Sequence, residues 1–293
     1  MYLSVIHTDG SQTETYTSDD NNGHQATTIY EYNATGEQIS LREDDILTWI
    51  DESNDSSVTH TKETLHTLTS NTDGTQTEVY STNEDGQVTS LTYSYNNTGA
   101  IVSLIELQAD GSQTETYTTD DNNGHQTTTI YDYNANGEQI SLREDDVLTW
   151  VDNSNVTHFK ETLHTLVTNT NGTKSEVYFS NEDGVITTVQ YEDVIQTNTT
   201  PFDANVADVS FNIIESNNNY VFNIENFGVG DNLFFSNNAI TPTISNLNTT
   251  DNEVDVIYTD GAIQTTIHLT GISPMQDASI SDYDTFLTTF SPS

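Results

Sequence analysis

Four short acidic segments carry the residue types that bind calcium. They read SDDNNG from Ser18, STNEDG from Ser81, TDDNNG from Thr119 and FSNEDG from Phe179. Each resembles the D-x-[DN]-x-[DN]-G loop, in which side-chain oxygens surround a Ca²⁺ ion. The third and fifth ligand positions are filled in all four segments, by Asp20 and Asn22, Asn83 and Asp85, Asp121 and Asn123, and Asn181 and Asp183.

The rest of the calcium loop is missing from these segments. The first ligand position holds Ser, Thr or Phe, and no Glu stands at the twelfth position to bind the ion with both carboxylate oxygens. The glycine-rich nonapeptide of calcium β-rolls is also absent. The sequence therefore leaves two interpretations open, degenerate calcium loops or plain polar hairpin turns, and it favours the turns.

Histidines are a second candidate for metal binding. They recur in two matching sets, His24, His60 and His66, and then His125, His158 and His164. On one strand, six residues at about 3.3 Å each place His60 and His66 roughly 20 Å apart, so the two cannot share an ion. Pairing across strands with His24 or His125 stays open beside the simpler interpretation, a solvated polar face.

Aromatic and guanidinium groups offer binding chemistry too. Trp49 and Trp150 lie at matching positions and are candidates for stacking on the sugar rings of surface glycans, with packing on a thin sheet as the alternative. Arg42 and Arg143, each followed by Glu-Asp-Asp, are expected to form structural ion pairs or turn contacts, with recognition of an anionic ligand as the alternative.

Catalytic motifs are missing. The chain has no G-x-S-x-G elbow, no H-E-x-x-H, no phosphate-binding loop and no dinucleotide fingerprint. Carboxylates occur throughout, so a pair of them is no sign of acid–base catalysis. We expect a protein that is not an enzyme and needs no cofactor, calcium being the one candidate.

A long repeat organises the elements that must position these residues. The stretch 9–41 returns almost unchanged at 110–142, a period of about 101 residues, with weaker copies at 73–104 and from Asn171. The repeat units lie near 9–108 and 110–193. A repeat at a fixed period indicates stacked supersecondary units.

Each copy has the pattern of β-hairpins. Thr, Tyr, Ile and Val fill segments of five to eight residues, and Asp-Gly, Asn-Gly and Thr-Gly pairs separate them. LTWID from Leu47 and VTHTKETLHTLTS from Val58 are predicted as further strands. Residues 1–197 are thus predicted to form an all-β hairpin meander or solenoid, with roughly three hairpins in each unit.

Composition limits the class of protein. Apolar residues make up 32% of the 293, too few for a thick core, so a thin sheet is expected. The net charge of −41 arises because Lys and Arg number only five, which excludes nucleic acid as a partner. There is no cysteine and no apolar run long enough for a membrane span. The start, MYLSVIHTDG, lacks the features of a signal peptide and matches the middle of a repeat, so a fragment of a longer protein is expected.

The pattern changes near residue 198. Residues 198–205 read as a linker, and 206–293 as a C-terminal β-sandwich or β-roll-like domain without the repeat. Its predicted strands are VADVSFNII, NYVFNI, DNLFF, EVDVIYTD and GAIQTTIHLTGI.

Two resemblances follow from these segments. YEYNATGEQISL from Tyr30, YDYNANGEQISL from Tyr131 and YSYNNTGAIVSL from Tyr93 resemble the YD repeat of RHS-type proteins, with Asn in place of the usual Asp. The family's toxin-enclosing shell needs many more copies, so that activity is not implied. The C-terminal run NFGVGDNLFF from Asn226, with an acidic end free of Lys and Arg, is similar to the uncleaved secretion domains of large repetitive proteins exported by type I secretion.

Together these observations predict a secreted, non-catalytic repeat protein at the cell surface, acting as an adhesin or as surface-layer, matrix or fibre material. Its exposed edge strands are expected to associate with further copies. The alternatives are a carbohydrate- or calcium-binding extracellular module and a non-catalytic fragment of a larger secreted enzyme.

Overall fold

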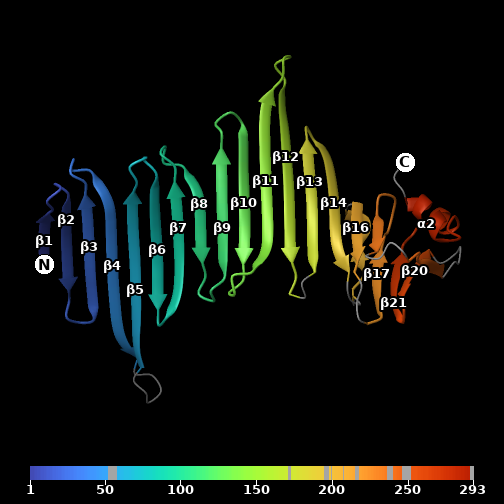
Figure 1. The fold of residues 1–293 in the computed structure, drawn as a ribbon, viewed down its shortest axis with the longest axis horizontal. Helices are drawn as coiled ribbons and strands as arrows, with labels where there is room; N and C mark the ends of the chain where they lie inside the picture. Colours follow the sequence, from blue (N-terminus) through green and yellow to red (C-terminus); the bar gives the residue numbers. More distant parts are fainter. Residues whose placement is uncertain are drawn as a thin grey trace. The chain divides into compact units, whose positions relative to one another are not determined.

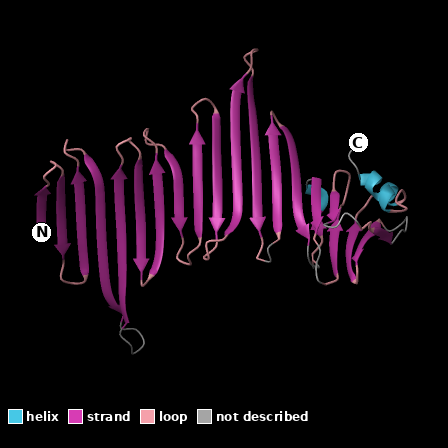
Figure 2. Cartoon of the chain, viewed as in Figure 1, coloured by secondary structure: helices cyan, strands magenta, loops and turns pink. Residues whose placement is uncertain are grey.

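The computed structural model describes residues 1–51, 58–170, 173–194, 198, 200–206, 208–214, 218–235, 240–245 and 252–290. The chain is all-β, as the sequence predicts, and the described residues include three short helices, one after β15 (Phe202–Asp203) and two near the C-terminus (Figures 1 and 2). It divides into two compact units, Met1–Asp146 and Val147–Ser293, which are described in turn.

The first unit is a meander of antiparallel strands. The strands are β1 (Tyr2–Ile6), β2 (Gln12–Asp19), β3 (His24–Tyr32), β4 (Gln38–Asp51), β5 (Val58–Ser70), β6 (Gln76–Glu84), β7 (Gln87–Tyr95), β8 (Ile101–Leu107), β9 (Gln113–Asp120) and β10 (His125–Tyr133). Strand β11 (Gln139–Val151) begins in this unit and ends in the second. Each strand from β1 to β9 pairs with the next one in the sequence. The prediction that Val58 to Ser70 form one strand is confirmed.

Local turn chemistry explains why the chain reverses where it does. In the turn between β1 and β2, the carboxylate of Asp9 accepts hydrogen bonds from the Ser11 backbone N–H (3.0 Å) and hydroxyl (2.7 Å). Gly10 follows with φ of 87°, a conformation that costs glycine little and other residues more. Asp110 and Ser112 repeat the same contacts in the second copy.

The sheet of the first unit is a single layer. Among the described residues of Met1–Asp146, Ser103 alone is buried, and the other strand residues are half-buried or exposed. Cross-strand ring contacts partly replace a core, as in the row Tyr2–Tyr16–Tyr30 with ring centroids 4.8 and 6.0 Å apart. The strands are therefore held by ladder hydrogen bonds and side-chain pairs within the layer.

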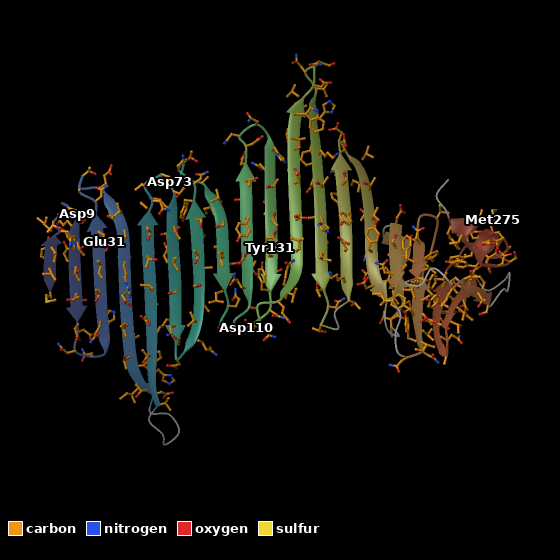
Figure 3. The ribbon with its side chains drawn as sticks, viewed as in Figure 1. Asp9, Glu31, Asp73, Asp110, Tyr131 and Met275 are labelled. Carbon is orange, nitrogen blue, oxygen red and sulfur yellow. The ribbon has the colours of Figure 1, made fainter. Side chains whose placement is uncertain are left out.

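One repeat contains seven strands in the described part of this unit, β2 to β8, one more than three hairpins would supply. Because seven is odd, β9 runs opposite to its counterpart β2. Equivalent turns therefore lie at opposite ends of the strands, with Asp9 at one end and Asp110 at the other (Figure 3).

The odd number of strands also exchanges the two faces. Direct cross-strand partners share a face. The partners run from Tyr16 through Thr28, Glu43, His66, Tyr80, Leu91 and Glu106 to Thr114. Tyr117, the repeat counterpart of Tyr16, is three residues from Thr114 and so lies on the opposite face. We call the face of Tyr16 face 1 and the face of Tyr117 face 2.

A pair of turn glycines gives a test of this geometry. Both have positive φ, 95° at Gly23 and 84° at Gly36, but a Cβ at Gly23 would lie 2.3 Å from the Thr48 carbonyl oxygen, whereas one at Gly36 meets nothing within 4 Å. We expect Gly36→Ala to destabilise the fold by about 1 kcal/mol and Gly23→Ala by about 2–3 kcal/mol or more, since only the latter forces the backbone apart. Urea unfolding followed by tryptophan fluorescence measures both, and equal losses would contradict the close approach.

The second unit contains further strands of the meander and a domain with a buried hydrophobic core. Its elements are β12 (Thr157–Thr168), β13 (Lys174–Glu182), β14 (Val185–Val194), β15 (Phe202–Asp203), η2 (Ala204–Val206), β16 (Asp208–Ile213), β17 (Tyr220–Glu225), β18 (Asn232–Phe235), β19 (Thr243–Ser245), β20 (Glu253–Asp260), β21 (Ile263–Thr270), α1 (Pro274–Asp277) and α2 (Tyr283–Phe290). The predicted linker 198–205 thus contains β15 and the start of η2. All five strands predicted after residue 206 are present.

The strands form two sheets. Among the described residues, sixteen strands follow the order β1 to β14, then β16 and β18, and five form a sheet of order β15-β17-β21-β20-β19. From β14 to β19 successive strands alternate between the sheets, and the pairs β14–β16, β16–β18 and β17–β21 are parallel. This winding fits the predicted β-sandwich or β-roll-like domain.

Apolar side chains from both sheets and from α2 fill the space inside this domain. Val209 and Phe211 of β16, Val256 of β20 and Ile267 of β21 are fully buried, and Phe286 of α2 packs with them. Alternation of buried and exposed residues along β20 and β21 places every second side chain in this core.

Candidate functional site

The same three side chains meet twice in the chain, and we call each group a Trp–His–Asp cluster. In the first, the Trp49 and His60 rings stack with centroids 5.2 Å apart at 19°, and His60 Nδ1 lies 2.5 Å from Asp85 Oδ2. In the second, Trp150 stacks on His158 at 5.1 Å and 18°, and His158 Nδ1 lies 2.5 Å from Asp183 Oδ2. The same geometry in both copies indicates that this contact is a regular feature of the repeat.

Pairing between strands builds each cluster. Trp49 of β4 and His60 of β5 are direct cross-strand partners. Asp85 lies in the turn between β6 and β7, with φ of 51°, and its Oδ1 accepts a hydrogen bond from the Thr61 N–H at 2.8 Å. The carboxylate thereby fastens that turn to β5.

Electrostatics favour an ionic pair in each cluster. The hydrogen bond to Asp85 raises the pKa of His60 above its ordinary value, and the same bond lowers the pKa of Asp85. In the second cluster, the bond to Asp183 raises the pKa of His158 and the same bond lowers the pKa of Asp183. An imidazolium between a carboxylate and an indole face is favourable on both sides.

These clusters predict a dependence of stability on pH. The histidines have folded-state pKa values above about 6.5, so their contribution is full below that pH and is lost as pH rises through the raised values. The aspartates, with lowered pKa values, contribute above about pH 3.9 and lose this only in stronger acid. We expect the thermal midpoint to fall between pH 6 and pH 8, and to fall less in the double variant His60→Gln/His158→Gln.

The matched control for this experiment is His7→Gln, because His7 bonds a hydroxyl, Thr13 Oγ1 at 2.9 Å, and no carboxylate. Circular dichroism melts at several pH values provide the measurement. A double variant with the wild-type pH slope would show that the clusters do not govern it.

The four acidic segments lie in four separate hairpin turns, and the residue at the third ligand position of each accepts hydrogen bonds within its own turn. Asp20 Oδ1 accepts hydrogen bonds from the N–H groups of Asn22 (2.7 Å) and His24 (3.1 Å), which lower its pKa. Asp121 repeats this with Asn123 (2.7 Å) and His125 (3.1 Å).

The other two segments also cap their own turns. Asn83 Oδ1 accepts from the Gly86 N–H at 3.0 Å, and Asn181 Oδ1 from the Gly184 N–H at 3.0 Å. In the part of the chain that the structure describes, no three His, Asp or Glu side chains are grouped to hold a metal ion. Calcium binding by these loops stays a prediction.

Apart from His7, the remaining histidines and both arginines bond carboxylates. His24 Nε2 lies 2.6 Å from Asp45 Oδ1, so it does not join His60. Arg42 pairs with Asp44 at 3.0 Å and Arg143 with Asp145 at 3.6 Å, which confirms the structural ion pairs expected for the two arginines.

A row of polar contacts crosses face 1. His66 lies between Glu43 and Glu78, at 2.9 Å from each, and stacks on Tyr80 with centroids 4.4 Å apart. Glu78 also accepts hydrogen bonds from the Tyr80 and Tyr95 hydroxyls. Glu43, His66 and Tyr80 line a hollow of about 500 Å³ over β3 to β6.

The C-terminal domain holds one buried carboxylate. Asp231 is 5% exposed, and its two oxygens accept hydrogen bonds from the N–H groups of Val209 (2.8 Å) and Gly228 (2.7 Å). Burial, aided by the charge of Asp208, raises the pKa of Asp231 to about 6. The loop that holds Asp231 is therefore fixed to β16 through this side chain.

Sequence reasoning missed the Trp–His–Asp clusters, although the signal was present. His60 and Asp85 are 25 residues apart, and His158 and Asp183 repeat that separation. The local motif places Asp85 and Asp183 beside Asn83 and Asn181 as candidate calcium ligands, because a hexapeptide is visible in the sequence and a partner on a neighbouring strand is not.

Among the described residues, no helix has the length and apolar content to cross a membrane. No protein-family model matches the chain, and the search of curated proteins finds no significant similarity to it.

Proposed function

We propose that this chain is a secreted, non-catalytic repeat protein that acts as an adhesin or as surface-layer, matrix or fibre material. The observation that carries the proposal is the single-layer sheet of Met1–Asp146, in which Ser103 alone is buried among the described residues. Such a layer offers two large faces for contact and little enclosed volume for a reaction. The net charge of −41 and the lack of cysteine support a role outside the cell.

Export is the part of this proposal that is tested most directly. The full chain and a chain ending at residue 197 are each expressed in a bacterial host with a type I exporter, and both are measured in medium and cells. We expect only the full chain in the medium. Equal retention of both chains inside the cells would refute the assignment of residues 206–293 to export.

A second candidate function is binding of surface glycans by the Trp–His–Asp clusters. Trp49 and Trp150 are half-buried, with part of each ring accessible beside a charged His–Asp pair. Stacking on a sugar ring needs such an aromatic surface next to polar groups. Glycan-array binding that disappears in Trp49→Ala/Trp150→Ala would establish this function, and an array without signal would remove it.

Calcium binding by the four acidic turns belongs to this second candidate function, an extracellular binding module. Both Ca²⁺ and Mg²⁺ screen the repulsion among the carboxylates, so an equal rise of the thermal midpoint with either ion is the result expected from screening alone. A rise specific to Ca²⁺ and reduced in Asp20→Ala/Asp121→Ala would assign calcium to the turns.

A further inference from the structure

Three hairpin turns of the first unit share one side-chain arrangement. Asn33, Asn96 and Asn134 begin the turns that follow β3, β7 and β10. The Oδ1 atom of each accepts hydrogen bonds from the backbone N–H groups two and four residues later, at distances of 2.9 to 3.1 Å. These two bonds close the turn in the same way three times, so differences among the three turns must come from other side chains.

Two of the three turns match Asn-x-Thr, the acceptor pattern for N-linked sugars. They read NAT from Asn33 and NNT from Asn96, whereas the third reads NAN from Asn134. In the first two, the threonine hydroxyl donates a further hydrogen bond to the Asn Oδ1 atom, at 2.6 Å from Thr35 and 2.7 Å from Thr98. The third turn forms without any hydroxyl, so the fold itself does not need the threonine.

Three donors on one amide oxygen prepare the amide nitrogen for reaction. A carboxamide nitrogen is a poor nucleophile, because its lone pair is shared with the carbonyl group. Hydrogen bonds that stabilise negative charge on the oxygen make loss of an N–H proton easier, as the donors of an oxyanion hole do for acyl transfer. At Asn96 these donors are the Thr98 N–H and hydroxyl and the Ala100 N–H.

The nitrogen atom is available at Asn96 and occupied in the other two turns. Asn33 Nδ2 donates a hydrogen bond to the Glu37 carboxylate at 2.8 Å, and the turn of Asn134 has the same contact at 2.8 Å. Ala100 stands at the corresponding position of the third turn and has no side-chain acceptor. Among the described residues, none accepts a hydrogen bond from Asn96 Nδ2.

The turn of Asn96 is open to a large partner. Asn96 itself is half-buried, residues 97–100 are exposed, and a Cβ at Gly99 would meet nothing within 4 Å. The turn connects β7 and β8 at an end of the strands (Figure 1). An enzyme can therefore reach this side chain without opening the sheet.

Two further Asn-x-Thr patterns among the described residues lack the arrangement. The described contacts of Asn155 include no hydrogen bond from the Thr157 hydroxyl to its amide oxygen. Asn198 Nδ2 is occupied, since it donates to the carbonyl oxygens of Thr200 at 2.9 Å and Asn223 at 2.8 Å. Asn96 alone combines the hydroxyl contact with a free nitrogen.

We propose that Asn96 is a site of N-linked glycosylation on the folded chain, with a sugar diphosphate as the donor. The bond from sugar C1 to the diphosphate oxygen breaks, and the leaving diphosphate keeps the electron pair. C1 bonds to Asn96 Nδ2, which loses one proton to a base of the transferase. Nδ2 keeps one hydrogen and Oδ1 keeps its three donors, so the turn survives the modification. This inference goes beyond the proposed function, and export has no part in its test.

The folded full chain, incubated with a soluble N-glycosyltransferase and a nucleotide-activated hexose, tests the site. Peptide mass mapping is expected to find one hexose on Asn96, about tenfold less on Asn33, and none on Asn134. The difference at Asn33 corresponds to breaking one hydrogen bond to a charged group. Thr98→Ser should keep the sugar on Asn96, and Thr98→Ala should remove it.

The substitution Glu37→Ala supplies a test by gain of modification. It releases Asn33 Nδ2, and the Thr35 hydroxyl stays in place, so occupancy of Asn33 should rise to that of Asn96. The matched control is Glu138→Ala, which releases the nitrogen of Asn134 in a turn that has no hydroxyl and should therefore add no sugar. Circular dichroism checks that each variant keeps its fold.

Equal occupancy of Asn33 and Asn96 in the folded wild type would overturn the proposal. So would an unmodified Asn96 when the same transferase modifies a synthetic peptide of residues 90–104. A host that transfers sugar from a lipid diphosphate before folding separates the two kinds of donor, because there the sequence pattern alone is read and both asparagines should be modified alike. Selectivity for Asn96 in that host would show that the folded turn does not make the choice.

Discussion

Substitution of Phe286 by alanine is expected to lower the free energy of unfolding of the C-terminal domain by about 3–5 kcal/mol. Phe286 is buried at the centre of an aromatic group, with ring centroids 5.8 Å from Phe227, 5.9 Å from Tyr283 and 5.0 Å from Phe290. Truncation removes the buried ring and leaves a cavity that its neighbours fill only in part. This is the largest loss that we expect from a single side chain.

The neighbouring residue supplies the control. Leu287 is 44% exposed on the same helix, so Leu287→Ala should cost well under half as much. Both tryptophans precede residue 151 and so lie outside this domain, and hydrogen exchange is therefore the better measurement. We expect Phe286→Ala to speed exchange in β17, β20 and β21 and to leave β2 to β8 unchanged. Equal effects of the two variants would show that α2 does not help to close the core.

The second large effect is expected at Asp231. Asp231→Ala leaves the N–H groups of Val209 and Gly228 without their acceptors. Each unsatisfied buried group costs about 1–3 kcal/mol, and because Gly228 is only half-buried the expected loss for the two groups is about 2–5 kcal/mol. Asp231→Asn keeps one acceptor oxygen and should lose less. Urea unfolding followed by hydrogen exchange in β16 measures both variants. An unchanged free energy of unfolding in Asp231→Ala would contradict the role of this carboxylate in holding the loop to β16.

Asp231 also has a pH signature of its own. Its folded-state pKa of about 6 is raised above the unfolded value, so it binds a proton more tightly when the domain is folded. Its contribution to stability is full below about pH 4 and is lost as pH rises through 6. The stability of the wild type relative to Asp231→Asn should therefore decrease between pH 4 and pH 6.5, and a constant difference would contradict the raised pKa.

The Trp–His–Asp clusters illustrate the limit of local motifs. Asp85 and Asn83 share a hexapeptide that resembles a calcium loop, yet Asp85 bonds His60 on the neighbouring strand β5 while Asn83 caps Gly86 within the turn. Neighbours in a sequence motif can thus have unrelated partners, because a turn residue at the sheet edge reaches the adjacent strand as easily as its own loop.

The helices α1 and α2 could not be predicted from the alternating pattern that identifies the strands. Residues 274–290 carry Thr and aromatic residues that suit a sheet, but Pro274 follows the capping residue Ser273, and Phe286 and Phe290 lie one turn apart on the buried side of α2. Contacts with Phe227, far away in the sequence, decide the outcome.

The turns, the strands between them and the 101-residue repeat could all be predicted from the order of the residues. Those features depend on backbone preferences of single residues, such as the positive φ of Gly10 and the Asp9 contacts beside it. The folded arrangement was needed to show that Tyr16 and Tyr117 lie on opposite faces, that β14 and β16 pair in parallel, and that His60 meets Asp85. These depend on the number and register of strand pairings, and register is set by contacts among residues distant in the chain, where a shift of one residue turns every side chain to the other face.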